Sequence, residues 1–237
     1  MNAFRYTLQD DDLPRLGLVV LQVDETIEQD FRHLLPPHIA RLHVTRVPSG
    51  AELTPDSISA MERALPDAAR LLPDTKPLDV VGYACTSGTT LIGADRVREL
   101  VTSVVRTRTV TDPLTAALAA CQSRGLARLG IVSPYIASVA EPIRKAFESG
   151  GVAVPDMLSF GEQVEARVAR IAPQSIAEAA RALARRSKLD GIFLSCTNLR
   201  TLDILAPLTQ ELGLPVLSSN QCLAAHMAAL TTVTVDL

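Results

Sequence analysis

The sequence has few aromatic residues and no tryptophan: Phe, Trp and Tyr make up 3% of its 237 residues. It also has no excess of positive charge, since 23 Lys and Arg stand against 26 Asp and Glu, and the net charge is −3. Proteins that bind nucleic acid usually carry a basic patch or aromatic side chains for base stacking. This composition favours neither, and we expect no nucleic-acid partner.

The sequence has no run of about 18 apolar residues, so we expect no membrane-spanning helix and no membrane partner. The N-terminal segment is polar, contains three Asp at 10–12, and lacks the basic and then apolar pattern of a secretory signal peptide. We therefore expect a cytoplasmic protein with free thiols. None of its four cysteines forms a C-x-x-C pair: Cys85, Cys121, Cys196 and Cys222.

Motifs for common cofactors are also missing from the sequence. Neither G-x-G-x-x-G nor a P-loop is present, and the four histidines show no metal-ligand spacing. The G-x-S-x-G pattern of serine hydrolases is absent as well. We expect no cofactor and no metal.

The chain does contain an internal repeat that ends twice in a cysteine. Residues 78–87 (LDVVGYACTS) match residues 189–198 (LDGIFLSCTN) at an offset of 111. Two further blocks match in the same order, 15–19 with 128–132 and 111–117 with 219–225. Three matches in register favour a duplication over chance similarity between apolar strands.

Short apolar runs alternate with helical patterns along the whole chain. Strands are predicted at 16–21, 42–47, 80–84, 104–110, 129–133, 152–154, 191–195 and 215–218, with a further edge strand at 233–235. Helices are predicted at 25–34, 56–71, 91–101, 114–124, 136–148, 174–187, 199–212 and 221–230.

Strands that are apolar throughout and alternate with helices predict parallel sheets covered on both faces. The predicted fold class is α/β, with two lobes related by a pseudo-twofold, each a parallel sheet flanked by helices. We expect an N-terminal lobe at 1–124 and a C-terminal lobe at 125–237, whose last helix is free to pack on the first lobe.

Four chemically active residues fall directly after predicted strands: Asp24, Cys85, Tyr135 and Cys196. Ligands of parallel sheets bind beyond the carboxyl ends of the strands, so we expect these side chains at one rim of their sheets. Asp24 either caps the following helix or faces the substrate. Tyr135 either donates a hydrogen bond to a carboxylate or is a packing aromatic.

Each repeated phrase is read as a buried strand that runs into Cys-Thr and then a helix. A thiol at a helix N-terminus meets unpaired backbone N–H groups, which lower its pKa, so we expect a thiol that reacts below about pH 8.5. Thr86, Ser87 and Gly88 after the first cysteine form a natural cradle for a carboxylate. Cysteine is also a common core residue, and that interpretation suits Cys121 and Cys222, which lie in apolar helical stretches.

At these residues the sequence resembles the aspartate/glutamate racemase superfamily, in the branch that holds maleate cis–trans isomerase and arylmalonate decarboxylase. Four motifs carry the likeness, which extends over nearly the whole chain: CTSG at 85–88, SPY at 133–135, SCTN at 195–198 and PVLSSNQ at 215–221. The resemblance implies a racemase-like fold of two α/β lobes with the active site between them and no cofactor.

The resemblance also implies roles for the site residues. Thr86, Ser87 and Tyr135 would hold one substrate carboxylate, while Cys85 and Cys196 would act on opposite faces of the reacting carbon. We expect Thr197 and Asn198, in the second cysteine motif, to contact the substrate too.

The chain departs from its relatives at several positions. The decarboxylase has Gly in place of Cys85, which makes decarboxylation less favoured here. The amino-acid racemases carry Cys-Asn-Thr and Cys-Thr-His at the two sites, whereas this chain has Cys-Thr-Ser at the first and no His at the second. Maleate isomerase has Asn where Asp24 stands, and another Asn in the loop where this chain has GEQVE at 161–165. An ionised Asp24 would repel a second carboxylate 4 Å away by about 4 kcal/mol at an effective dielectric near 20, and would attract an ammonium group.

We therefore predict a cofactor-independent two-cysteine isomerase, a racemase or epimerase or a cis–trans isomerase, acting on a small carboxylate. Residues 21–28 also resemble the branch linked to ectoine utilisation, which favours an amino-acid-like substrate such as a diaminobutyrate derivative. The alternatives are a maleate cis–trans isomerase, an arylmalonate-type decarboxylase and a non-catalytic carboxylate binder. A homo-oligomer stays open, since nothing in the sequence marks an interface.

Overall fold

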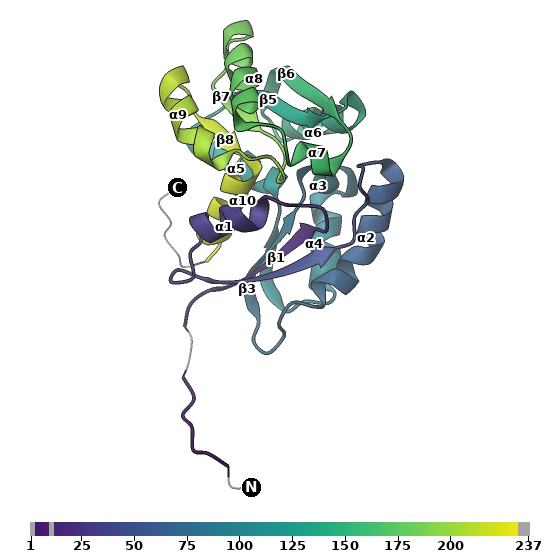
Figure 1. Ribbon diagram of the computed structural model, residues 1–237, viewed down its shortest axis with the longest axis vertical. Coiled ribbons are helices and arrows are strands. Elements are labelled where there is room, and N and C mark those ends of the chain that lie inside the picture. The colour runs from purple at the N-terminus through teal and green to yellow at the C-terminus, as the bar shows by residue number, and fades with distance from the viewer. Residues whose placement is uncertain (1–2, 10–11, 232–237) are drawn as a thin grey trace.

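Two parallel four-stranded sheets form the centre of the protein (Figure 1). The computed structural model describes residues 3–9 and 12–231. The first sheet has the order β2-β1-β3-β4 and contains β1 (Arg15–Leu21), β2 (Arg41–Val47), β3 (Leu78–Ala84) and β4 (Thr107–Thr111). The second has the order β6-β5-β7-β8 and contains β5 (Arg128–Tyr135), β6 (Ala153–Glu162), β7 (Gly191–Leu194) and β8 (Val216–Ser218). The strand order is therefore the same in both halves, and the predicted α/β fold of two related lobes is confirmed.

Helices follow the strands in both halves. They are α1 (Ile27–Leu34), α2 (Pro55–Ala69), α3 (Thr86–Ile92), α4 (Ala94–Thr102), α5 (Pro113–Arg124), α6 (Ala137–Ser149), α7 (Glu165–Val168), α8 (Pro173–Arg186), α9 (Leu202–Leu212) and α10 (Ser219–Ala229). The start of α2 is fixed by residues close to each other in the sequence. The Thr54 hydroxyl accepts from the Ser57 N–H, and the Ser57 hydroxyl accepts from the Thr54 N–H. Within the described residues, none of the helices has the length and apolarity needed to cross a membrane.

Two predicted elements extend differently in the structure. The helix predicted at 91–101 is two helices, because Gly93 adopts φ +96° and ends α3 before α4 begins. The short strand predicted at 152–154 continues to Glu162, since its later residues pair along β5. The edge strand predicted at 233–235 lies outside the described residues.

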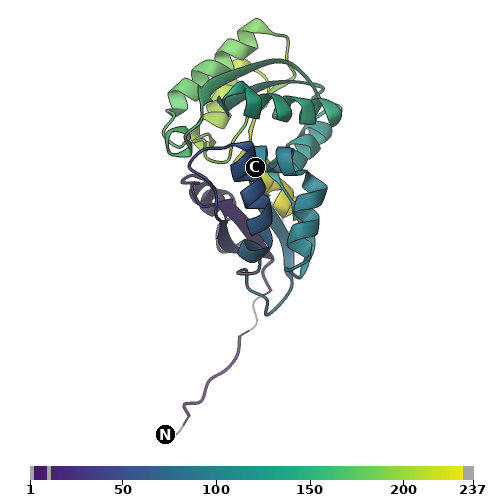
Figure 2. The same ribbon diagram turned by 90° about the vertical axis from the view of Figure 1, so that its right-hand side faces the viewer.

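The last helix of each half of the sequence packs on the sheet of the other half. Ala117 and other apolar residues of α5 belong to the core of the second sheet, together with Phe193. Met227 of α10 is buried against Leu18 and its neighbours in the first sheet. Figure 2 shows the yellow helix α10 among the blue elements of the first half. The packing of α5 on the second sheet and of α10 on the first therefore holds the two halves together.

Candidate active site

The carboxyl ends of the two sheets meet, and hydrogen bonds between the two halves join them. The Asn198 side-chain carbonyl accepts from the Glu25 N–H at 2.9 Å, and its backbone carbonyl accepts from the Thr26 hydroxyl at 3.0 Å. The Thr197 hydroxyl donates to the carbonyl of Ala84, the last residue of β3, at 3.3 Å. The segments after β1, β3 and β7 therefore lie around one buried region.

Cys85 lies at the end of β3 and caps α3. Its Sγ accepts from the Gly88 N–H at 3.1 Å and lies 3.7 Å from the Ser87 hydroxyl. Burial nevertheless raises the pKa of the Cys85 thiol to about 12, and the carboxyls of Glu165 and Asp24 raise it further against the effect of these donors. The Gly88 N–H at the helix N-terminus does lower this pKa as expected, but the loss of solvation outweighs it and the net shift is upward.

Cys196 follows β7 in a strained conformation. Its φ of +147° is the only positive value at a non-glycine residue in the part of the chain that the structure describes. Such strain costs about 1–3 kcal/mol and is concentrated at functional sites. The helix predicted at 199–212 begins only at Leu202, so Cys196 does not cap it as Cys85 caps α3.

The contacts of the Cys196 sulfur are a phenol and a backbone amide. The Tyr135 hydroxyl lies 3.0 Å from Sγ, and the Asn198 N–H donates to Sγ at 3.3 Å. Burial, followed by the negative charge of Glu165, raises the pKa of the Cys196 thiol well above its usual value. Both thiols are 3% exposed, so neither is poised as a free surface thiolate.

Glu165 is a buried carboxyl beside these thiols that sequence reasoning did not single out. The Tyr135 hydroxyl donates to its Oε1 at 2.7 Å, and the Asn198 side-chain amide donates to its Oε2 at 3.0 Å. Burial raises the pKa of Glu165, and the nearby Asp24 raises it further. The signal in the sequence was its place in the segment at 161–165, where the resemblance puts an Asn in maleate isomerase.

Asp24 fills the structural one of the two roles that the sequence left open. Its Oδ1 accepts from the backbone N–H groups of Thr26 at 2.8 Å and Ile27 at 2.9 Å, and so fixes the start of α1. Among the described residues, none forms a hydrogen bond with its buried Oδ2. Burial raises the pKa of Asp24, and the N–H groups of Ile27 and Thr26, followed by the Thr197 hydroxyl, lower it by less. One oxygen is therefore structural, and the other is buried without such a contact.

Thr86 and Ser87 are buried in the first turn of α3, next to Cys85. The Thr86 hydroxyl shares a hydrogen bond of 2.9 Å with the Ser219 hydroxyl, which also accepts from the Cys196 N–H at 3.0 Å. Ser219 thus joins the two cysteine segments, a role that sequence reasoning did not assign. The repeated block at 219–225 was the available signal.

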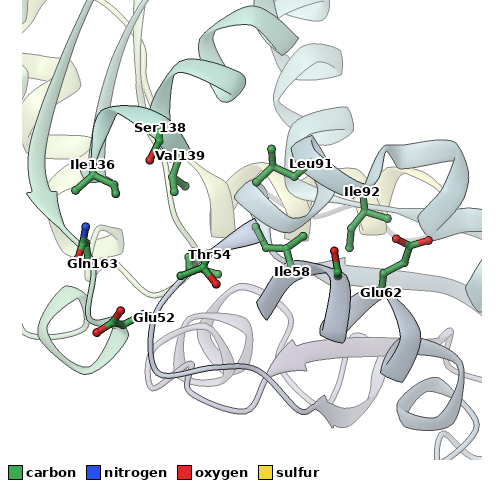
Figure 3. A pocket seen from close by; sticks show the side chains of 12 residues that line it. Glu52, Thr54, Ile58, Glu62, Leu91, Ile92, Ile136, Ser138, Val139 and Gln163 are labelled. Atoms are coloured by element: carbon green, nitrogen blue, oxygen red, sulfur yellow. The ribbon is translucent and has the colours of Figure 1, made fainter. Parts of the chain in front are cut away.

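A backbone pairing joins the two halves at Glu165 and forms a seam between them. The Glu165 N–H donates to the Ala51 carbonyl at 2.9 Å, and Glu52 pairs antiparallel with Val164. Beside this seam is a cavity of about 360 Å³ between α2, α3 and α6, with Ile58 and Leu91 among the side chains around it (Figure 3). Neither Cys85 nor Cys196 lines this cavity.

The remaining thiols and the metal-ligating side chains form no second site. Cys121 on α5 and Cys222 on α10 are buried in one apolar cluster with Phe193 and Leu217. Among the described residues, no group of three or more His, Cys, Asp and Glu side chains is arranged to hold a metal ion.

Comparison with curated proteins finds two relatives that match most of the chain. Maleate isomerase of Nocardia farcinica is 26% identical over 217 residues, which are 86% of this chain and 85% of the relative. Arylmalonate decarboxylase of Bordetella bronchiseptica is 28% identical over 222 residues, which are 90% of this chain and 88% of the relative. The predicted link to the ectoine-utilisation branch gains no support from these relatives.

Solved structures share the fold over nearly the whole chain. Maleate cis–trans isomerase of Nocardia farcinica, in a mutant with a covalently bound succinylcysteine intermediate, has a TM-score of 0.83 at 23% identity and covers 93% of this chain and 94% of its own. The maleate isomerase Iso of Pseudomonas putida S16 has a TM-score of 0.81 at 19% identity, with 94% and 96% covered. The family model described as arylmalonate decarboxylase (Amdase) matches residues 49–237, and the chain therefore belongs to that family.

Proposed function

We propose that the protein is a cofactor-independent isomerase in which Cys85 and Cys196 act as a pair on a small carboxylate. The observation that carries this proposal is that the two cysteine segments meet: the Ser219 hydroxyl lies 2.9 Å from the Thr86 hydroxyl and accepts from the Cys196 N–H at 3.0 Å. The Thr197 hydroxyl also donates to the carbonyl of Ala84, next to Cys85, and these contacts support two thiols that lie around one substrate position. The strained backbone at Cys196 supports a functional role for the second thiol.

The carboxylate of the substrate binds next to Cys85 in this proposal. Thr86 and Ser87 offer hydroxyl and backbone donors at the first turn of α3, and Tyr135 offers a phenolic hydrogen. Thr197 and Asn198 approach from the other half. Donors arranged in this way stabilise the negative charge that develops on a carboxylate when its α-proton is removed.

Racemisation or epimerisation is the first of two mechanisms. One thiolate removes the proton from the α-carbon, and the opposite thiol delivers a proton to the other face. The donors hold the enediolate-like intermediate between the two steps. No cofactor enters this scheme, because the thiols and the charge-stabilising donors supply both functions.

Cis–trans isomerisation is the second mechanism, and the succinylcysteine in the Nocardia farcinica structure favours it. In this chain, the Cys85 thiolate would add to the double bond, the single bond would rotate, and elimination would restore the alkene. Cys196 would protonate the intermediate. Maleate is the reference substrate for this alternative.

Two features favour an amino-acid-like substrate over maleate. Asp24 presents a buried, unpartnered Oδ2, and Glu165 is a second buried carboxyl nearby. Burial raises the pKa of Asp24, and an ammonium group beside it would stabilise the ionised carboxylate against that effect. A second substrate carboxylate 4 Å from the ionised form would be repelled by about 4 kcal/mol. A diaminobutyrate derivative is one substrate with this charge pattern.

Proton exchange in deuterium oxide, followed by NMR, tests the proposal. The panel contains maleate, aspartate, glutamate, diaminobutyrate and its N-acetyl derivatives, with an arylmalonate to detect decarboxylation. Wild type is compared with Cys85→Ala and Cys196→Ala, and with Cys121→Ala as a control in which a core thiol is removed. We expect deuterium at the α-carbon of an amino acid, lost in both active-site variants and kept in the control.

The other outcomes separate the alternatives. Fumarate formed from maleate would assign cis–trans isomerisation and show the argument from Asp24 to be wrong. Carbon dioxide released from the arylmalonate, with dependence on Cys196 alone, would assign a decarboxylase. Ligand binding without turnover, unchanged by loss of either thiol, would assign a non-catalytic carboxylate binder.

A further inference from the structure

Three polar side chains form a directed chain of hydrogen bonds that starts at Cys196. Tyr135 has one phenolic hydrogen, and it is donated to Glu165 Oε1 at 2.7 Å. The contact of 3.0 Å between Tyr135 Oη and Cys196 Sγ must then have the thiol as its donor. The hydrogens therefore point from Cys196 to Tyr135 and from Tyr135 to Glu165.

We propose that Glu165 is a positioning residue that accepts the proton of Cys196 through Tyr135 and so prepares the Cys196 thiolate. The S–H proton moves to Tyr135 Oη while the phenolic proton moves to Glu165 Oε1. The products are a thiolate, a neutral tyrosine and a carboxylic acid, so charge and protons balance without any group from outside. This inference rests on the proposed function, because it assigns a task to Cys196 in that reaction.

The surroundings of Glu165 suit a proton acceptor. Its side chain is 1% exposed, and the titratable groups that influence its site are Asp24, Tyr135 and the two active-site thiols. The arginines on and after its own short helix pair elsewhere, Arg167 with Glu162 at 2.8 Å and Arg170 with Glu25 at 3.2 Å. Burial beside a second acid therefore disfavours the ionised carboxylate and draws a proton to it.

Asn198 fixes the direction of the transfer. Its amide donates to Oε2 of Glu165 at 3.0 Å, which leaves Oε1 facing Tyr135. Cys85 has a different environment, since its sulfur contacts the Gly88 N–H and the Ser87 hydroxyl. The two thiols are thus prepared differently, Cys85 by hydrogen-bond donors and Cys196 by a carboxyl.

The single phenolic hydrogen also sets the order of events. Tyr135 donates either to Glu165 or to the carboxylate of a substrate, and not to both. The transfer therefore belongs to the ligand-free protein, in which a thiolate is formed before the substrate carboxylate takes over the phenolic hydrogen.

When Cys196 and Glu165 share one proton, the fraction of Cys196 thiolate depends on pH in a characteristic way. Over the range in which the pair holds one proton, the fraction of thiolate depends on the internal equilibrium and not on pH. Without the acceptor, the thiolate forms only by loss of a proton to solvent. Its fraction then rises about tenfold per pH unit below the thiol pKa.

Alkylation of Cys196 by iodoacetamide without substrate tests the inference. The rate is measured from pH 6 to 8 by peptide mass spectrometry on the whole chain, for wild type, Glu165→Gln and Tyr135→Phe. We expect a change of less than about threefold in wild type and a rise of about tenfold per pH unit in both variants. Glu25→Gln, which removes a half-exposed carboxylate, is the control and keeps the flat profile.

Three results would overturn the inference: a steep profile in wild type, a flat profile in Glu165→Gln, or a flat profile in Tyr135→Phe. Tyr135→Phe keeps the charge of Glu165 and removes only the path, so it separates proton transfer from a change in local charge or folding. Because no substrate is present, failure of the exchange experiment above would refute the proposed function and leave this result standing.

Discussion

Asp30 makes the stability of this protein depend on pH in a direction opposite to that of an ordinary salt-bridged carboxylate. It lies on α1, is 9% exposed, and accepts at 2.8 Å from Asn220 of α10. Burial raises the pKa of Asp30 from 3.8 to about 6, with Asp24 and Asp203 raising it and Asn220 and His33 lowering it. A carboxyl whose pKa is raised on folding destabilises the folded protein as pH increases from the unfolded to the folded value.

The size of this effect follows from the pKa. A shift of about two units corresponds to about 3 kcal/mol, absent below about pH 4 and complete above about pH 6. Asp30→Asn keeps a side-chain oxygen for Asn220 and removes the titration. We therefore expect the free energy of unfolding of the variant, relative to wild type, to increase by about 3 kcal/mol between pH 4 and pH 7.

Urea denaturation of both proteins at pH 4, 5, 6 and 7 measures this difference. Asp67→Asn, which removes an 81% exposed carboxylate on α2, is the control and should shift stability by less than about 1 kcal/mol at every pH. A difference between Asp30→Asn and wild type that stays constant within about 0.5 kcal/mol across the range would refute the reasoning.

Three further substitutions test the packing, the active-site turn and a helix cap. Met227→Ala removes a fully buried side chain of the exchanged helix α10, and we expect a loss of about 2–5 kcal/mol in urea denaturation. Gly88→Ala would place a Cβ 2.8 Å from Cys85 Sγ, and the displaced thiol should lower the exchange rate by about 100-fold while the fold, followed by circular dichroism, is kept. Thr54→Ala removes the cap of α2 and should cost about 1 kcal/mol in thermal unfolding, whereas Thr54→Ser should retain most of that stability.

Much of the fold could be predicted from local sequence. The apolar runs of the strands and the helical spacing between them are properties of short segments, and they predict parallel sheets wherever they alternate. The predicted end of β3 at Cys85 followed by a helix matches the structure for the same reason. Local patterns failed at Gly93, where a left-handed φ divides one predicted helix in two, and at the turn after Cys196.

The sequence by itself determined the α/β alternation, the repeat and the positions of Cys85 and Cys196 after strands, because apolar periodicity and turn residues act over a few neighbours. Only the tertiary structure decided which side chains share the buried region. Glu165 begins α7 next to a backbone pairing with residues 51–52, and it meets Tyr135 and Asn198 through contacts between distant segments. The tertiary structure also decided that the pKa of each thiol shifts upward, because desolvation depends on which groups the rest of the chain places around the sulfur.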